Sequence, residues 1–91
     1  KFDIDKYVAE HPDAKPIQAV AEGQILWQYD VVGQSTAPNI GDAVKEGKDV
    51  CYIQAYYGIE PVKANFSGKI AAIMAKHGAH VVKGEIVGFI E

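Results

Sequence analysis

The side chains most able to do chemistry in this 91-residue chain are one cysteine and three histidines. Cys51 is the single thiol, and a nucleophilic cysteine needs an exposed, electropositive setting and a partnered histidine. It lies instead in the apolar run 50–53, which is typical of a small buried side chain. His77 and His80 are three residues apart in a turn, with no further ligand nearby in the sequence and no CxxC or HExxH pattern. We therefore expect polar turn residues and no metal site.

Phosphate binding has no support in the sequence. The nine glycines form neither GxGxxG nor GxxxxGK[ST], because they are placed as hairpin turns rather than between a strand and a helix. All nine basic residues are lysines, the net charge is -3, and arginine, the residue most used to grip phosphates and base edges, is absent. A nucleic-acid partner is not expected, and neither is an autonomous enzyme.

The composition is that of one globular domain. Hydrophobic residues make up 48% of the chain and charged residues 23%, close to the globular average. No apolar stretch approaches the roughly 18 to 20 residues that span a bilayer, and no basic-then-apolar leader opens the chain. A single cysteine cannot form an internal disulfide, which suits a reducing compartment. We expect a cytoplasmic protein with no membrane partner.

The elements that must position these residues begin with a polar segment, 1–16, which we interpret as a linker. Apolar side chains recur in it at i, i+3 and i+4, namely at Ile4, Tyr7 and Val8. With Asp3 as N-cap and Pro12 as terminator, one or two helical turns are plausible here. His11 lies in the same segment.

From residue 17 onward the helical period disappears, and short runs rich in Val, Ile, Tyr and Phe alternate with glycines. The predicted strands are 17–20, 24–30, 43–44, 49–55, 60–64, 69–75, 80–82 and 86–90. The segment 17–91 is therefore predicted to be an all-β domain.

An internal repeat then decides the architecture. The stretch 41–54 aligns with 78–91 without a gap, at an offset of 37 residues. The identical pairs are Gly41 with Gly78, Val44 with Val81, Gly47 with Gly84, Val50 with Val87, and Ile53 with Ile90. The shared apolar positions should point inward, because the repeat keeps them while their neighbours differ. Two copies are too few for an open solenoid, so a closed, pseudo-two-fold sandwich is predicted.

The repeat is broken at one place. Gly23 and Gly68 also correspond, but their offset is 45 residues, so the first half carries eight additional residues within 31–39. The segment combines Gly, Ser, Thr, Pro and Asn, which is loop chemistry.

The turn GDAVKEG at 41–47, the Ser-Gly-Lys-Ile at 67–70 and the second turn and strand at 78–90 resemble the biotinyl/lipoyl carrier-domain family. The resemblance covers about residues 17–91 and implies a flattened β barrel-sandwich hybrid of two quasi-symmetric halves. Within the family, the chain is most similar to the domain that follows the linker in two carboxyltransferase-type subunits, that of pyruvate carboxylase and the alpha subunit of oxaloacetate decarboxylase. The implied partners are other domains or subunits of a carboxylase-type enzyme.

Family members present a lysine at the tip of the central hairpin, commonly as Ala-Met-Lys-Met, and a ligase joins its amine to the carboxyl group of the cofactor. Aligned through the flanking turns, the tip falls on 55–60 and the position of the lysine on Tyr57. A phenol is a poor substitute for an amine in amide formation. The resemblance thus implies a non-catalytic docking or structural module that carries no biotin, the family cofactor.

The tip itself has two interpretations. Tyr56 and Tyr57 can be ordinary turn residues, with Gly58 supplying the positive φ of a three-residue loop. Two adjacent exposed tyrosines also make a good contact surface, since Tyr buries much area with few rotamers to freeze.

Two other functions stay open. The domain can be a true biotin or lipoyl carrier modified at an unexpected lysine such as Lys63, six residues beyond Tyr57. It can also bind a small molecule between the 31–39 insert and the hairpin tip, because in the family the loop in this region lies beside the modification hairpin.

Overall fold

Ten strands and one short helix form the elements of the computed structural model of this chain, which describes residues 3–27, 29–31, 34–36 and 40–91, with 29–31 and 34–36 described by their backbone alone. In chain order they are α1 (Ile4–Glu10), β1 (Lys15–Gln18), β2 (Gly23–Leu26), β3 (Tyr29–Val31), β4 (Gln34–Thr36), β5 (Ala43–Val44), β6 (Asp49–Ala55), β7 (Gly58–Lys63), β8 (Gly68–Ile73), β9 (His80–Val81) and β10 (Ile86–Ile90).

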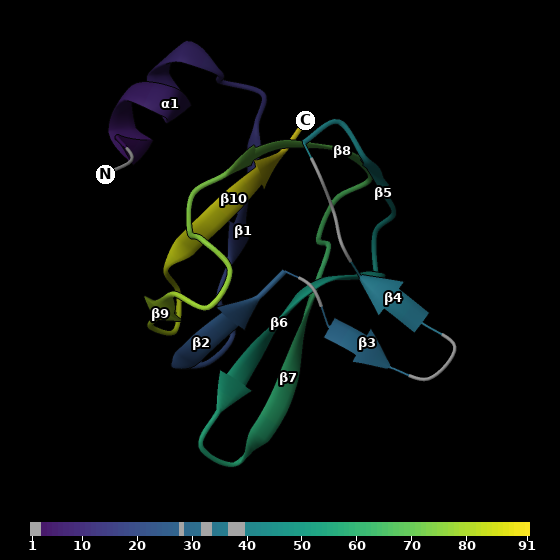
Figure 1. Ribbon diagram of the computed structural model, residues 1–91. Helices are drawn as coiled ribbons and strands as arrows, with labels where there is room; N and C mark the ends of the chain where they lie inside the picture. The colour runs from purple at the N-terminus through teal and green to yellow at the C-terminus, as the bar shows by residue number, and fades with distance from the viewer. Residues whose placement is uncertain (1–2, 28, 32–33, 37–39) are drawn as a thin grey trace.

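The strands assemble into two four-stranded sheets that share one hydrophobic core (Figure 1). One sheet has the order β1-β10-β8-β5 and the other the order β7-β6-β2-β9. β3 pairs with β4 in a separate two-stranded sheet beside them. The predicted all-β barrel-sandwich architecture is confirmed.

The two sheets are related by the sequence repeat. β5 corresponds to β9 and β6 to β10, and each sheet takes one of these short strands from the other half of the chain. β9 pairs with β2, whereas β5 pairs with β8. The two halves are thus interleaved rather than stacked, which is the closed two-fold arrangement that the repeat predicts.

Hydrogen bonds from the turn glycines repeat with the same symmetry. The amide of Gly41 donates to the Ile70 carbonyl at 2.7 Å, and the amide of Gly78 donates to the Ile25 carbonyl at 2.6 Å. Both glycines have positive φ, 97° at Gly41 and 86° at Gly78, which L side chains rarely adopt. The repeat therefore keeps glycine here for its backbone conformation.

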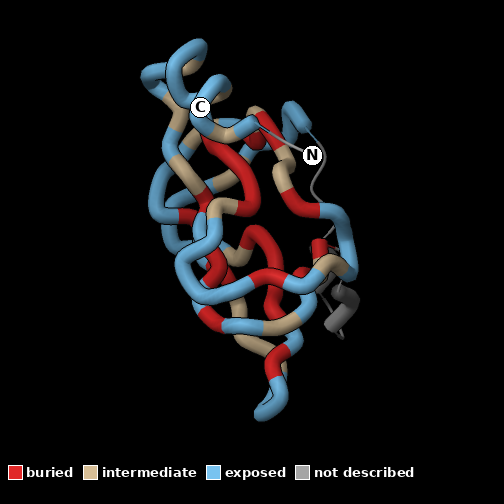
Figure 2. The backbone as a smooth tube through the Cα atoms, turned by 90° about the vertical axis from the view of Figure 1, so that its left-hand side faces the viewer, coloured by how far each residue is buried: buried red, intermediate tan, exposed pale blue. Residues whose placement is uncertain are grey.

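The core is formed by the apolar positions that the repeat preserves. Those fully buried are Val50, Ile53, Val81, Val87 and Ile90. Val44 is half-buried and packs against the same cluster. Figure 2 shows these buried stretches in the interior, with exposed turns around them. The inward orientation predicted for the repeated residues is confirmed for the five buried ones, and it holds in part for Val44.

The N-terminal segment contains the predicted helical turns, because α1 spans Ile4–Glu10 and the side chain of Asp3 accepts a hydrogen bond from the Lys6 amide at 3.0 Å. The Tyr7 ring stacks on Phe89 of β10, with ring centroids 4.6 Å apart. β1 begins at Lys15, so the segment predicted as a linker reaches into the first strand and packs on the domain. Within the described ranges, no helix is long and apolar enough to cross a membrane.

The insert is the place where the loop prediction was wrong. β4 (Gln34–Thr36) lies within 31–39 and pairs with β3 in antiparallel register, Val31 opposite Gln34. The polar composition predicts a loop, yet a ladder of backbone hydrogen bonds tolerates Gln, Ser and Thr on a strand pair that lies outside the two main sheets. Residues 32–33 and 37–39 lie outside the described residues.

The predicted strand 24–30 is also divided in the structure. β2 ends at Leu26, and the Trp27 that follows is turned into the core. Its indole Nε1 donates to the Ala75 carbonyl at 2.7 Å, and its backbone amide donates to His77 Nδ1 at 3.0 Å. These bonds to the β8–β9 connection replace the strand ladder, so the chain leaves the sheet here.

Replacing Ile53 or Ile90 with alanine should destabilise the domain by about 2 to 5 kcal/mol, because each side chain is fully buried at equivalent places in the two sheets. The free energy of unfolding in urea measures this. Lys45→Ala, in an exposed turn, serves as the control and should change it by less than about 0.5 kcal/mol. Losses below about 1 kcal/mol at both isoleucines would contradict the two-fold packing.

Gly23 and Gly68 allow a second test of the symmetry. A Cβ at Gly23 would overlap the Gln54 carbonyl, and one at Gly68 would overlap the Glu91 carbonyl, which is the repeat counterpart of Gln54. Each Gly→Ala variant should lose about 1 to 3 kcal/mol in thermal or urea unfolding, since backbone must shift. Lys69→Ala on the same strand is the control, and a loss at only one glycine would argue against equivalent packing.

Candidate functional site

The β6–β7 hairpin presents the predicted tip. The strands pair from Asp49 opposite Lys63 to Ala55 opposite Gly58, which leaves Tyr56 and Tyr57 as the turn. Gly58 has a φ of 143°, a conformation that L side chains rarely adopt. The hairpin extends away from the body of the domain at the lower end of Figures 1 and 2. The structure thus places Tyr56, Tyr57 and Gly58 together at an exposed tip, as the alignment predicts.

The two tyrosines form an exposed aromatic pair. Tyr56 is 99% exposed and Tyr57 is 59% exposed. Their ring centroids are 5.1 Å apart and their planes are at 88°, an edge-to-face contact. Because the rings contact each other, the tip offers a defined apolar surface rather than two independent side chains.

A pocket of about 660 Å³ lies against one side of this tip. Three stretches of the chain that are distant in sequence contribute to its lining. The lining residues are Val20, Ala21, Glu22, Gly23, Tyr56, Tyr57, His80 and Lys83. The β1–β2 connection thus forms one wall, the tyrosine turn another, and β9 with the turn after it a third.

The charged groups of the pocket are unequally partnered. His80 Nε2 and Glu22 Oε2 are 3.1 Å apart and form an ion pair when the imidazole is protonated. Lys83 has no ion-pair or hydrogen-bond partner for its side chain among the described residues. The pocket therefore combines aromatic and small apolar walls with one unneutralised cation.

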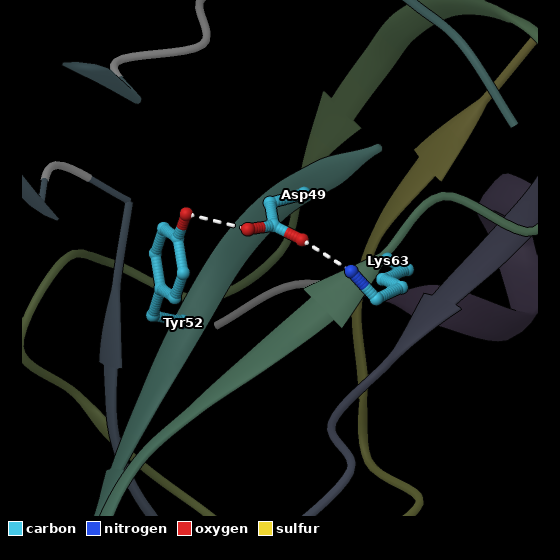
Figure 3. A network of polar contacts seen from close by, with 3 residues as sticks. All are labelled: Asp49, Tyr52 and Lys63. Carbon is cyan, nitrogen blue, oxygen red and sulfur yellow. Dashed lines mark hydrogen bonds and ion pairs between the residues drawn. The ribbon is translucent and has the colours of Figure 1, made fainter. Parts of the chain in front are cut away.

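Lys63 lies at the other end of the hairpin, in the network drawn in Figure 3. Its Nζ donates to Asp49 Oδ1 at 2.9 Å, and the Tyr52 hydroxyl donates to Asp49 Oδ2 at 2.7 Å. The hydrogen bond from Tyr52, together with that from Lys63, lowers the pKa of the Asp49 carboxyl. Lys63 thus pairs with a carboxylate across the strands, away from the turn.

The other residues considered for chemistry have structural places. Cys51 is fully buried, and burial raises the pKa of its thiol to about 12. His77 accepts the Trp27 amide, and His11 Nδ1 lies 3.3 Å from Glu91 Oε1. Across the part of the chain that is described, no three His, Cys, Asp or Glu side chains come together in a way that could hold a metal ion.

Sequence reasoning found the tip but missed the pocket. Val20, Glu22 and Lys83 carry no motif, and only the pairing of β2 with β9 brings the first wall to the third. The predicted small-molecule site between the insert and the tip stays a prediction, because the side chains of 31–39 lie outside the described residues. The pocket found here is lined by other stretches.

Comparison with known proteins gives one finding on family. The biotin/lipoyl family model, described as "Biotin-requiring enzyme", matches residues 32–90. The match includes the whole β6–β7 hairpin and both copies of the repeat. No curated protein matches the chain.

Asp49→Asn should remove part of the acid sensitivity of the fold. A carboxyl whose pKa is lowered on folding, here from an ordinary value of 3.8, stabilises the fold above that value, and this contribution is lost as the pH falls through the folded-state pKa. We expect the variant to be about 1 kcal/mol less stable than the wild type at pH 7 in urea unfolding, with a smaller difference at about pH 3. Glu46→Gln is the control, and an unchanged difference between the two pH values would contradict the role of the carboxylate.

Proposed function

Because this chain belongs to the biotin/lipoyl family of biotin-requiring enzymes, whose domain is a carrier module and not itself a catalyst, we propose that it acts as an unmodified docking or structural module. The larger assembly is a biotin-dependent carboxylase or decarboxylase of the pyruvate or oxaloacetate type. The observation that carries the proposal is the aromatic turn of the central hairpin, which offers no amine.

The chemistry of the turn supports this proposal. A carrier of this kind holds its cofactor by an amide to a lysine amine, which must reach the ligase at an exposed site. Tyr56 and Tyr57 occupy that exposed turn, and phenols do not replace the amine. The scaffold around the turn is intact, with both sheets and both turn glycines in place.

The position of Lys63 argues against modification there. It lies at the far end of β7, roughly 16 Å along the strand from Gly58 at about 3.3 Å per residue. Its amine is held by Asp49 in register across the hairpin. A ligase that reads a lysine at a turn would meet neither the geometry nor a free amine at this position.

A docking role is supported by the exposure of the tip. Tyrosine is enriched in protein interfaces because it buries a large area at a low cost in conformational entropy. Tyr56 and Tyr57 spend no area on the core of their own domain. We propose other domains or subunits of the carboxylase-type enzyme as the partners, in the cytoplasm.

Co-expression of this chain with a biotin ligase and excess biotin tests the central point. Intact mass spectrometry should show the unmodified mass, because no lysine is presented at the turn. A family carrier with its lysine in place, expressed alongside, must be modified under the same conditions. A biotin adduct on any lysine of this chain contradicts the proposal, and peptide mapping of the adduct to Lys63 would support the alternative carrier.

Tyr57→Lys tests the register of the hairpin. If the turn is the former attachment position, the variant gains a mass shift corresponding to one biotin, while Tyr56→Lys, one position earlier, gains less. Lys63→Arg combined with Tyr57→Lys should leave the adduct unchanged. Modification of Tyr56→Lys in preference to Tyr57→Lys would show that the alignment of the tip is off by one residue.

A further inference from the structure

The pocket beside the tyrosine tip has a chemistry that the docking proposal does not use. Four of the large hydrophobic side chains that are exposed in the described part of the chain gather around this end: Val20, Tyr56, Tyr57 and Val82. Val82 neighbours Lys83 in the turn after β9, and the other three line the pocket directly. The pocket is thus an apolar hollow within a wider apolar surface.

The size of the pocket suits a small organic molecule. Its volume of about 660 Å³ lies within the range of roughly 300 to 1,000 Å³ that is usual for ligand pockets. Such pockets are lined mainly by apolar and aromatic side chains, with a few polar groups that fix the orientation of the ligand. Here the aromatic wall comes from Tyr57 and its neighbour, and the polar groups come from the opposite wall.

The charges of the lining select the sign of the ligand. Glu22 and His80 lie 3.1 Å from each other and largely satisfy one another. Lys83 is the one lining cation without a partner among the described residues, and it is exposed. An anionic group placed beside Lys83 gains a charge-assisted contact, whereas a cation there is repelled.

From this geometry we propose that the pocket binds a small organic acid, with its aromatic or branched apolar group against Tyr56 and Tyr57 and its carboxylate at Lys83. Ala21 and Gly23 give the floor little bulk, so a flat group can approach the backbone. The site is distinct from the space between the insert and the tip. It does not depend on whether the turn once carried a cofactor.

Three probes with one apolar group and different charge test the proposal: 4-phenylbutanoate, 4-phenylbutan-1-ol and 4-phenylbutan-1-ammonium. Each is titrated into the ¹⁵N-labelled 91-residue chain while amide chemical shifts are followed. The carboxylate should shift the amides of the pocket lining and bind roughly three- to tenfold more tightly than the ammonium, with the alcohol between them. In roughly 0.5 M salt this preference should shrink, because exposed charges are screened.

Two variants with a matched control separate the charge from the apolar contact. Lys83→Met should abolish the preference for the carboxylate while the three probes still bind. Lys45→Met, in the repeat-equivalent turn before β6, should leave the preference unchanged. Tyr57→Ala should weaken all three probes by a similar factor, roughly threefold or more, with the amide spectrum of the core unaltered.

The proposal is overturned by any of three results. The first is that no probe shifts the amides of the pocket lining. The second is that all three probes bind equally, so that charge plays no part. The third is that the preference survives Lys83→Met or is lost in Lys45→Met, which would place the anion elsewhere on the surface.

Discussion

Each half of this domain completes a sheet of the other half, and the rest of the structure depends on this exchange. β9 supplies the edge beside β2, and β5 supplies the edge beside β8. The amides of Gly41 and Gly78 donate into the opposite half at the same time. Buried backbone groups must be paired, so neither half can satisfy its own strands alone. The fold is therefore cooperative across the two-fold axis, and the repeated glycines and apolar positions are those that this exchange needs.

The constraint ends where the symmetry ends. At one pole, Phe89 on β10 is covered by the ring of Tyr7 from α1. Its repeat counterpart, Tyr52 on β6, instead directs a hydroxyl to Asp49. Beyond Tyr52 the strand continues into the tyrosine turn, so this pole projects a hairpin while the other is covered by a helix. Differences between the halves are thus concentrated at the two ends, which is where partners and ligands can be recognised without disturbing the shared core.

The sequence predicts the parts of the structure that the repeat encodes twice. Turn glycines such as Gly41 and apolar positions such as Ile53 could be identified because each is checked by a second copy. The insert has no second copy, and its composition alone predicts a loop where β4 forms a strand. The early end of β2 was equally hidden, because it depends on Trp27 reaching acceptors at Ala75 and His77, far along the chain. The pocket needed the three-dimensional pairing of β2 with β9, which no local pattern encodes.

The separation between scaffold and tip explains how a carrier fold can persist without carrier chemistry. Tyr56 and Tyr57 belong to none of the core contacts, and the nearest turn constraint is the backbone of Gly58. A substitution at the turn therefore costs little stability, whereas a change at Ile53, a few residues back on β6, removes core packing. Selection for the fold alone leaves the acceptor position open to change. Membership in the family fixes the sheets and turns of this domain, and the residue at the tip must be judged by its own chemistry.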